Sequence, residues 1–389
     1  MFKLLKEVRC FAPCDIGKKD ILIIFDKIGF IEDDINGTLL PGIEVIPCRG
    51  CIAVPGFIDQ HVHIVGGGGE EGPHSRTPEI MLSNIIQAGV TTVVGVLGFD
   101  SITRGIAGLL AKARALENEG ISTYIYSGSY GTPMATLTGS VLTDIALIDK
   151  VVGVGEIAIS DFRSSYPSVE LLRKLAGEAK RGGMLGGKAG LVHLHVGDGK
   201  EGLNPLFQLL KESDFPKEMF LPTHINRTRD LFDQGIKYLS QGGRIDLTAG
   251  EKNGVSVPAA LAGIMKDQLS LEQVTITSDG NGSVPGRYGW EIGQVADLFE
   301  DFCRMAREGK IPFPQLLKTV TMNPAKNLKI FPQKGILAPG SDADILVLRE
   351  EDFSIELLLA RGKFLVKDQK LVQRGTFEID GRKEGDCHG

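Results

Sequence analysis

The sequence contains no long hydrophobic run and no excess of basic residues. Its apolar runs, such as residues 21–25 and 90–97, are far shorter than the roughly 20 residues that a membrane-spanning helix needs. The net charge of −6 and the absence of a long Lys- or Arg-rich run argue against a nucleic-acid-binding surface. The first residues lack the apolar core and cleavage site of a signal peptide. These absences predict a cytoplasmic protein that binds neither membranes nor nucleic acids.

Cysteine is scarce, with six residues in a chain of 389. Cys48 and Cys51 have the Cys-X-X-Cys spacing that is typical of a redox or zinc pair. Cys10 and Cys14 are spaced more widely, so a four-cysteine site would require the two pairs to meet in space. Reduced thiols are therefore the simpler interpretation for a cytosolic chain.

Histidine is scarce too, and its distribution is informative. The chain has seven histidines, and two of them, His61 and His63, end an apolar run that is followed by four consecutive glycines. Residues i and i+2 of a strand share a face, so these two imidazoles project the same way and form half of a metal site. Taken alone, such a pair is more often two ordinary strand histidines. Two later histidines, His195 and His224, also fall at strand ends and favour the metal interpretation.

The order of the expected elements predicts an α/β fold with two parts. Residues 1–55 contain short strands and turns, and the chain returns to short strands after residue 334. Between these ends, β-branched runs alternate with segments of helical spacing, which indicates a parallel sheet, and about eight repeats would close a barrel. We therefore expect a (β/α)8 TIM-like barrel, residues 56–334, flanked by a β-sandwich that both chain ends form, residues 1–55 and 335–379, and a flexible tail, residues 380–389.

Metal-competent side chains lie at successive ends of the expected barrel strands, where such barrels carry their chemistry. Each has an ordinary explanation by itself: a surface glutamate, a helix-capping aspartate, or a hydrogen-bonded histidine. Their joint placement is harder to explain in that way, and four imidazoles with two carboxylates suffice for two divalent ions with one bridging carboxylate. The predicted metal ligands are His61, His63, Glu156, His195, His224 and Asp279. His193 shares a face with His195 but is expected to pack deeper in the barrel.

Several longer motifs resemble the amidohydrolase superfamily. The segment 55–63 with its two histidines, the later single histidines, residues 278–283 and residues 339–344 all follow its pattern. Residues 66–70, 139–140, 159–163, 195–198 and 222–227 are similar, more narrowly, to the isoaspartyl dipeptidases of that superfamily. The resemblance runs over nearly the whole chain. It implies two zinc ions, hydrolysis of dipeptides that begin with a β-linked aspartate, and a homo-oligomer such as an octamer.

The resemblance also implies a role for each matching residue. Asp279, besides binding metal, is expected to act as general base and acid for a metal-bridging hydroxide, and Tyr130 to polarise the scissile carbonyl. Glu70 is expected to bind the substrate's α-ammonium group, and Arg163 and Arg227 its carboxylates, because the guanidinium fork matches both carboxylate oxygens. The remaining implied contacts to the aspartyl group are Gly68 and Ser283.

Two positions depart from the family pattern. The family's bridging ligand is a lysine carboxylated by carbon dioxide, whereas here Glu156 occupies that position and one extra residue, Gly155, precedes it. A glutamate side chain is several atoms shorter, so we predict that Gly155 forms a β-bulge that moves Glu156 inward to bridge the metals. The alternative is that the bridge is lost and only one metal binds tightly. Phe99 stands where the family tends to carry threonine, which leaves the range of dipeptides open.

Two other functions remain open at this point. One is a different amidohydrolase chemistry, such as an N-acyl-D-amino acid deacylase or a cyclic-amide hydrolase. The charges of Glu70, Arg163 and Arg227 argue against it, because a neutral cyclic amide does not need them. The other is a catalytically inactive binding or scaffold protein, but that function would predict missing ligands, and every ligand position here carries a metal-competent side chain.

Overall fold

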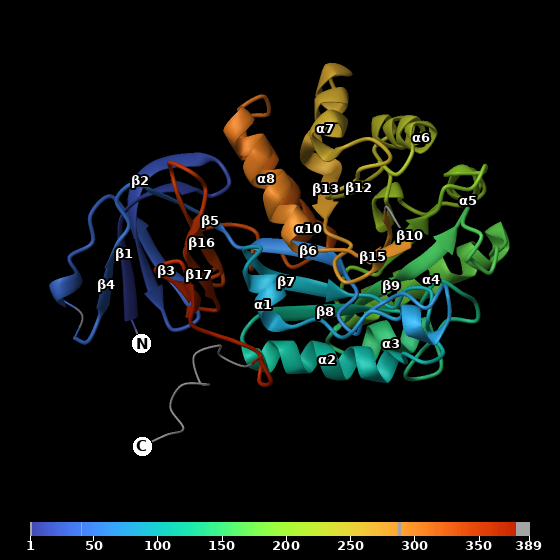
Figure 1. Cartoon of the computed structure of the whole chain (residues 1–389), viewed down its shortest axis with the longest axis horizontal. Helices are drawn as coiled ribbons and strands as arrows, with labels where there is room; N and C mark the ends of the chain where they lie inside the picture. Colours follow the sequence, from blue (N-terminus) through green and yellow to red (C-terminus); the bar gives the residue numbers. More distant parts are fainter. Residues whose placement is uncertain (1, 40, 287–288, 379–389) are drawn as a thin grey trace.

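The structure is a computed structural model that describes residues 2–39, 41–286 and 289–378. The predicted flexible tail, residues 380–389, lies outside the described residues. Figure 1 shows two parts side by side, a curled β-sheet with strands from the N-terminal and C-terminal segments of the chain, and a larger α/β part. None of the helices in the described ranges is long and apolar enough to cross a membrane.

Parallel strands of the α/β part form the predicted barrel. Six of them are hydrogen-bonded in sequence order from β6 to β11, and β12 pairs with β13. The six-stranded sheet and the β12–β13 pair are joined on one side by the amide of Ile225, which donates to the carbonyl of Asp246 at 3.2 Å. On the other side the amide of His63 donates to the carbonyl of Gly280 at 2.9 Å and closes the barrel. The strands are β6 (Phe57–Val62), β7 (Val90–Gly95), β8 (Ser122–Ser127), β9 (Val151–Ile159), β10 (Leu191–Val196), β11 (Phe220–Thr223), β12 (Ile245–Thr248) and β13 (Val274–Thr277).

Helices follow the barrel strands and pack on their outer side (Figure 1). Their buried faces are apolar, as in α8, where Leu298, Phe302 and Met305 repeat at the helical period. The helices are α1 (Leu82–Ile86), α2 (Ile106–Glu119), α3 (Val141–Leu147), α4 (Val169–Gly186), α5 (Asn204–Lys211), α6 (Arg229–Ser240), α7 (Val257–Lys266), α8 (Ala296–Glu308), α9 (Phe313–Val320) and α10 (Met322–Asn327).

Both chain ends contribute strands to the flanking sheet, as predicted. The strands run in the order β19-β18-β17-β16-β5-β1-β2-β3, with β4 also paired to β1. They form one continuous sheet, which curls so that apolar side chains from β1, β2, β16 and β17 share a core. The predicted boundaries at residues 55 and 335 stay predictions. The strands are β1 (Phe2–Phe11), β2 (Asp15–Ile24), β3 (Lys27–Glu32), β4 (Glu44–Pro47), β5 (Cys51–Pro55), β16 (Ile345–Arg349), β17 (Ile355–Ala360), β18 (Lys363–Lys367) and β19 (Lys370–Leu371).

The cysteines of the described chain are free thiols. Cys10, Cys48 and Cys51 are buried in the core of the flanking sheet, and Cys14 is exposed. Burial raises the pKa of Cys48 to about 12, so this thiol stays protonated at neutral pH. The cysteines of the flanking sheet therefore behave as small apolar side chains.

Candidate active site

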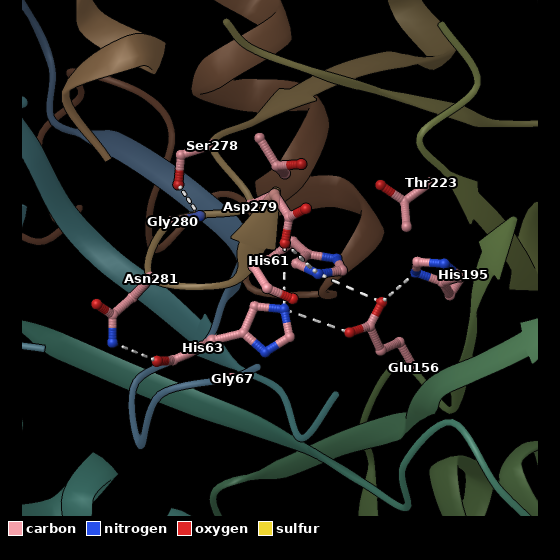
Figure 2. Close-up of polar contacts among 12 residues, drawn as sticks. His61, His63, Gly67, Glu156, His195, Thr223, Ser278, Asp279, Gly280 and Asn281 are labelled. Atoms are coloured by element: carbon pink, nitrogen blue, oxygen red, sulfur yellow. Dashed lines mark hydrogen bonds and ion pairs between the residues drawn. The ribbon is translucent and has the colours of Figure 1, made fainter. Parts of the chain in front are cut away.

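The six predicted ligands meet at one end of the barrel, around the carboxylate of Glu156. Figure 2 shows His61, His63, His195 and Asp279 around this carboxylate. Oε2 of Glu156 lies 3.4 Å from His61 Nε2, 3.1 Å from His195 Nδ1 and 3.8 Å from His224 Nε2, and its Oε1 lies 3.4 Å from His63 Nε2. Asp279 Oδ1 lies 3.3 Å from His61 Nε2 and 3.1 Å from His63 Nε2. Glu156 and Asp279 therefore share the two histidines of β6 and its C-terminal end.

Strand β9 places Glu156 in this centre through a β-bulge. Val154 pairs with Val192 and Ile157 with Leu194, so two residues of β9, Gly155 and Glu156, oppose the single residue His193 of β10. The structure thus confirms the predicted irregularity at Gly155. The runs 151–154 and 157–159 predict two separate strands by their apolar pattern, whereas the structure joins them into one strand through the bulge.

His195 is held in a defined orientation by groups on both sides of its ring. Its Nε2 lies 2.9 Å from Asp161 Oδ2, and its Nδ1 lies 2.8 Å from the hydroxyl of Tyr130. Its Nδ1 also lies 3.1 Å from Glu156 Oε2, so carboxylates flank both ring nitrogens and fix the orientation of the ring. Burial opposes the charge on Asp161, but hydrogen bonds from His195 and Arg163 hold its pKa well below the ordinary value.

His224 and Asp279 lie in the left-handed region of backbone conformation, with φ of 62° and 52°. Such values cost on the order of 1 kcal/mol for a side-chain-bearing residue, and they occur mainly where function requires a particular side-chain direction. The ring of His224 is fixed by Thr248, whose Oγ1 lies 2.7 Å from Nδ1. Asp279 follows Ser278, whose hydroxyl donates to the buried carboxyl of Asp59 at 2.5 Å.

The centre has the properties of a cation site. Among the described residues, His61 Nε2 and Glu156 Oε1 are buried without a hydrogen-bond partner, and both belong to the cluster. Burial disfavours charge on His61, but Glu156 and Asp279 raise its pKa well above the ordinary value. Three combinations of His, Glu and Asp have ligand atoms within 4.8 Å of one another. This donor set of imidazoles and carboxylates fits divalent metal ions.

A polar clamp, defined as Glu70, Arg163 and Ser283, lies beside the centre. Arg163 Nη1 donates to Glu70 Oε1 at 2.9 Å, and Ser283 Oγ donates to the same oxygen at 2.6 Å. The other edge of the guanidinium donates to both carboxylate oxygens of Asp161. Arg227 Nη1 lies 3.1 Å from His195 Nε2, so both arginines reach the metal centre.

Tyr130 is buried, and its hydroxyl points at His195. Burial and the charge of Glu156 raise its pKa well above the ordinary value, so the hydroxyl keeps its proton and can donate it. Gly68, a predicted substrate contact, has a structural explanation as well, because an added Cβ would lie 2.3 Å from the carbonyl oxygen of Ser75. Phe99 follows β7 and is 41% exposed.

Sequence reasoning missed several residues that shape the centre. Gly98 and Gly282 enclose His63, because a Cβ added to either would lie 2.7 Å from a carbon of its ring. Thr248 supports His224, and Trp290 lies 5.6 Å from the guanidinium of Arg163. Gly98 could have been found, because it comes directly after an apolar strand. No sequence pattern indicated that Thr248 or Trp290 lies at the site.

The chain is similar to known proteins over most of its length. The model of the amidohydrolase family matches residues 52–365. The structure of a beta-aspartyl dipeptidase from Fervidobacterium islandicum AW-1, in complex with a beta-Asp-Leu dipeptide, is 43% identical, covers 95% of this chain and 98% of its own, and superimposes with a TM-score of 0.90. A dihydropyrimidinase from Brevibacillus agri is 18% identical, covers 96% of this chain and 97% of its own, and has a TM-score of 0.68, which is a similarity of fold.

Curated relatives are more distant. An adenine deaminase from Desulforamulus reducens is 25% identical over 96% of this chain, and the match spans 60% of the relative's own length. The matched family segment covers the barrel, the metal-ligand cluster and the neighbouring strands of the flanking sheet. The chain belongs to the amidohydrolase family.

Proposed function

We propose that the chain is a metal-dependent dipeptidase that hydrolyses the isopeptide bond of β-aspartyl dipeptides with two zinc ions. The observation that carries this proposal is the contact between the cluster of six candidate metal ligands and the polar clamp of Glu70, Arg163 and Ser283, where Arg163 Nη2 lies 3.4 Å from His195 Nε2. The 43% identity to a beta-aspartyl dipeptidase supports the same substrate class. A dipeptide is then the small-molecule partner, and a homo-oligomer such as an octamer is the proposed assembly.

The cluster divides into two sets of ligands. We assign His61, His63 and Asp279 to one zinc ion and His195 and His224 to the other, with Glu156 as the bridge. Bound in this way, the ions would lower the pKa of a water molecule towards ~7 and polarise the scissile carbonyl. Glu156 suits the bridging role because burial opposes its charge, yet His61, His195 and His224 keep its pKa well below the ordinary value.

The clamp matches the charges of the proposed substrate. A β-aspartyl dipeptide carries one α-ammonium group and two carboxylates. Glu70 supplies the single anionic group for the ammonium, and Arg163 and Arg227 supply one guanidinium for each carboxylate. Ser283 fixes Glu70 through the hydrogen bond at 2.6 Å. Gly68 lies on the same loop as Glu70, and its backbone is the proposed contact to the aspartyl group.

Proton transfer is assigned to Asp279 and stabilisation of the carbonyl oxygen to Tyr130. Histidine neighbours hold the pKa of Asp279 well below the ordinary value against the effect of burial, so its carboxylate is ionised and can accept a proton from the nucleophilic water. The same group then delivers that proton to the leaving amine. Tyr130 keeps its hydroxyl proton and donates it to the oxygen on which negative charge develops.

Hydrolysis of β-aspartyl-leucine and α-aspartyl-leucine, by protein of measured zinc content, tests the proposal. Cleavage of the β-linked isomer alone is expected, because its ammonium and its free carboxylate are both attached to the aspartyl Cα, whereas in the α-linked isomer the α-carboxyl group forms the scissile bond. If protein that holds two zinc ions cleaves neither isomer, the dipeptidase function is wrong, and N-acyl-D-amino acids and cyclic amides become the substrates to assay. Light scattering tests the assembly, which a monomer mass would contradict.

A further inference from the structure

His193 is a fully buried imidazole beneath the metal centre that the proposed reaction does not use. Its Nε2 lies 2.7 Å from His61 Nδ1, and its Nδ1 lies 3.1 Å from the carbonyl oxygen of Leu221. Both atoms of the ring that can form hydrogen bonds are therefore engaged. These contacts connect the backbone of β11 to His193, and His193 to His61 of the proposed metal centre.

The chemistry of these three groups determines where the hydrogens lie. A backbone carbonyl only accepts, so Nδ1 of His193 must carry a hydrogen that it donates to Leu221. In a neutral ring the other nitrogen, Nε2, is then an acceptor. The hydrogen in the 2.7 Å contact must consequently belong to His61 Nδ1. A neutral His61 with its hydrogen on Nδ1 has a bare lone pair on Nε2, and this is the atom that faces Glu156 and Asp279.

We propose that His193 is a positioning residue, which binds His61 through Nε2 and thereby fixes the tautomer and ring orientation in which His61 presents Nε2 to a metal ion. This inference rests on the metal site of the proposed function. It extends that site by one residue, which binds no metal itself.

A packing role alone does not account for these contacts. His193 does pack, since the ring of Tyr126 stacks on it with centroids 4.9 Å apart, and Gly155 lies against its backbone. An apolar ring would fill the same space, but it would leave His61 Nδ1 buried without an acceptor. Metal-binding histidines ordinarily need such an acceptor on their second nitrogen, and its loss typically weakens metal binding by about 10–100-fold.

Three substitutions separate positioning from packing. His193→Gln keeps an acceptor at the position of Nε2, whereas the shorter amide in His193→Asn reaches only the position of Nδ1. Tyr126→Phe is the matched control, because it keeps the stacked ring and removes a hydroxyl that has no hydrogen-bond partner in the described chain. His193→Leu replaces His193→Asn if the asparagine variant does not fold. Zinc affinity is measured by competition with a chromophoric chelator, and thermal unfolding is recorded in excess chelator.

The inference predicts that His193→Asn binds one zinc ion about 10–100-fold more weakly than the wild type, and that His193→Gln and Tyr126→Phe stay within about threefold. Wild-type affinity in His193→Asn or His193→Leu, or an equal loss in His193→Gln, would overturn it. A lower unfolding temperature in chelator with unchanged zinc affinity would assign His193 to packing and also overturn it. A wild-type protein that binds no zinc would instead refute the proposed metal site.

Discussion

Gly155 lies directly against His193, at a separation that leaves no room for a side chain. A Cβ added to Gly155 would lie 2.7 Å from His193 Cβ and 2.8 Å from its carbonyl oxygen. Real Cβ atoms do not approach other heavy atoms this closely. The bulge that moves Glu156 into the metal centre therefore depends on a glycine at this position.

Gly155→Ala should destabilise the fold and displace Glu156. The added methyl must push β9 away from β10, which costs about 1–3 kcal/mol for an overpacked core. The matched control is Gly108→Ala in α2, where an added Cβ meets nothing within 4 Å and stability should rise by up to about 1 kcal/mol. Denaturant unfolding and zinc content measure both effects. Full zinc content in Gly155→Ala would show that the bulge does not position the carboxylate.

Glu156→Gln should reduce bound zinc from two ions to at most one. The amide has the shape of the carboxylate but lacks its charge, so we expect kcat/KM to fall by about 100-fold or more. Glu156→Lys with added bicarbonate is a second variant, which should not restore activity because the bulge brings the backbone closer to the proposed metal site than a carboxylated lysine requires. Metal analysis and steady-state kinetics check both variants. Full activity of Glu156→Lys without bicarbonate would contradict the bridging role.

Tyr130→Phe should lower kcat while zinc stays bound. The hydroxyl lies 2.8 Å from His195 Nδ1, so its loss removes one hydrogen-bond donor from the centre and no metal ligand. Loss of a donor of this kind typically costs about 100- to 1,000-fold in kcat. Kinetics on protein of measured zinc content test this expectation. A rise in KM with unchanged kcat would place Tyr130 in substrate binding instead.

Glu70→Gln should remove the selectivity for a substrate ammonium group. The wild type should prefer β-aspartyl-leucine to succinyl-leucine, which lacks that group, and the variant should cleave both at similar rates. Glu71→Gln is the neighbouring control, because Glu71 is exposed and its side chain should not influence the preference. The ratio of the two kcat/KM values is the readout. A preserved ratio in Glu70→Gln would mean that another group binds the ammonium.

Asp59→Asn should flatten the dependence of stability on pH. Burial raises the pKa of Asp59 to about 7, although hydrogen bonds from Ser278 and His61 favour its charged form. Between the unfolded pKa of about 3.9 and this value the unfolded state is ionised and the folded state holds the proton, so stability falls as pH rises. Unfolding free energies measured in chelator at pH 5 and pH 7 should show the wild type losing about 2 kcal/mol relative to the variant. If the unfolding free energies of both proteins depend on pH in the same way, the pKa of Asp59 is not raised in the folded state.

Local patterns predicted most of the fold. The alternation of β-branched runs and amphipathic segments gave the barrel, and the short strands at both ends gave the flanking sheet. The helical spacing of residues 101–119 and of residues 314–328 predicts one helix over each range. Helix α2 begins only at Ile106, however, and the second range is interrupted at Thr321 between α9 and α10. Strand β1 and helices α1, α3 and α8 were missed. In α8 the apolar period was present, but acidic and basic residues between its apolar positions obscured it.

The clustering of the six candidate ligands was predictable because each lies in a barrel strand or within two residues of its end, and sequence order places such residues at one end of a parallel barrel. Their supporting contacts were not predictable. Asp161 supports His195 through a loop, and His193 meets His61 across the barrel interior, so each contact depends on side-chain direction in three dimensions. The pairing of Glu70 with Arg163 joins loops 93 residues apart, and no local pattern encodes such a distance.

The sheet that contains both chain ends also has a consequence for assembly. Nζ of Lys3 donates to the carbonyl of Gly362 at 2.7 Å, across 359 residues of chain, and β5 pairs with β16 on either side of the whole barrel. During synthesis the N-terminal strands leave the ribosome long before their partners, so β5 exposes an open edge that invites association with other chains. That edge is covered only after the barrel has been translated. The sheet can therefore be completed only by a chain that contains the whole barrel, and a chain truncated within the barrel keeps the edge of β5 exposed.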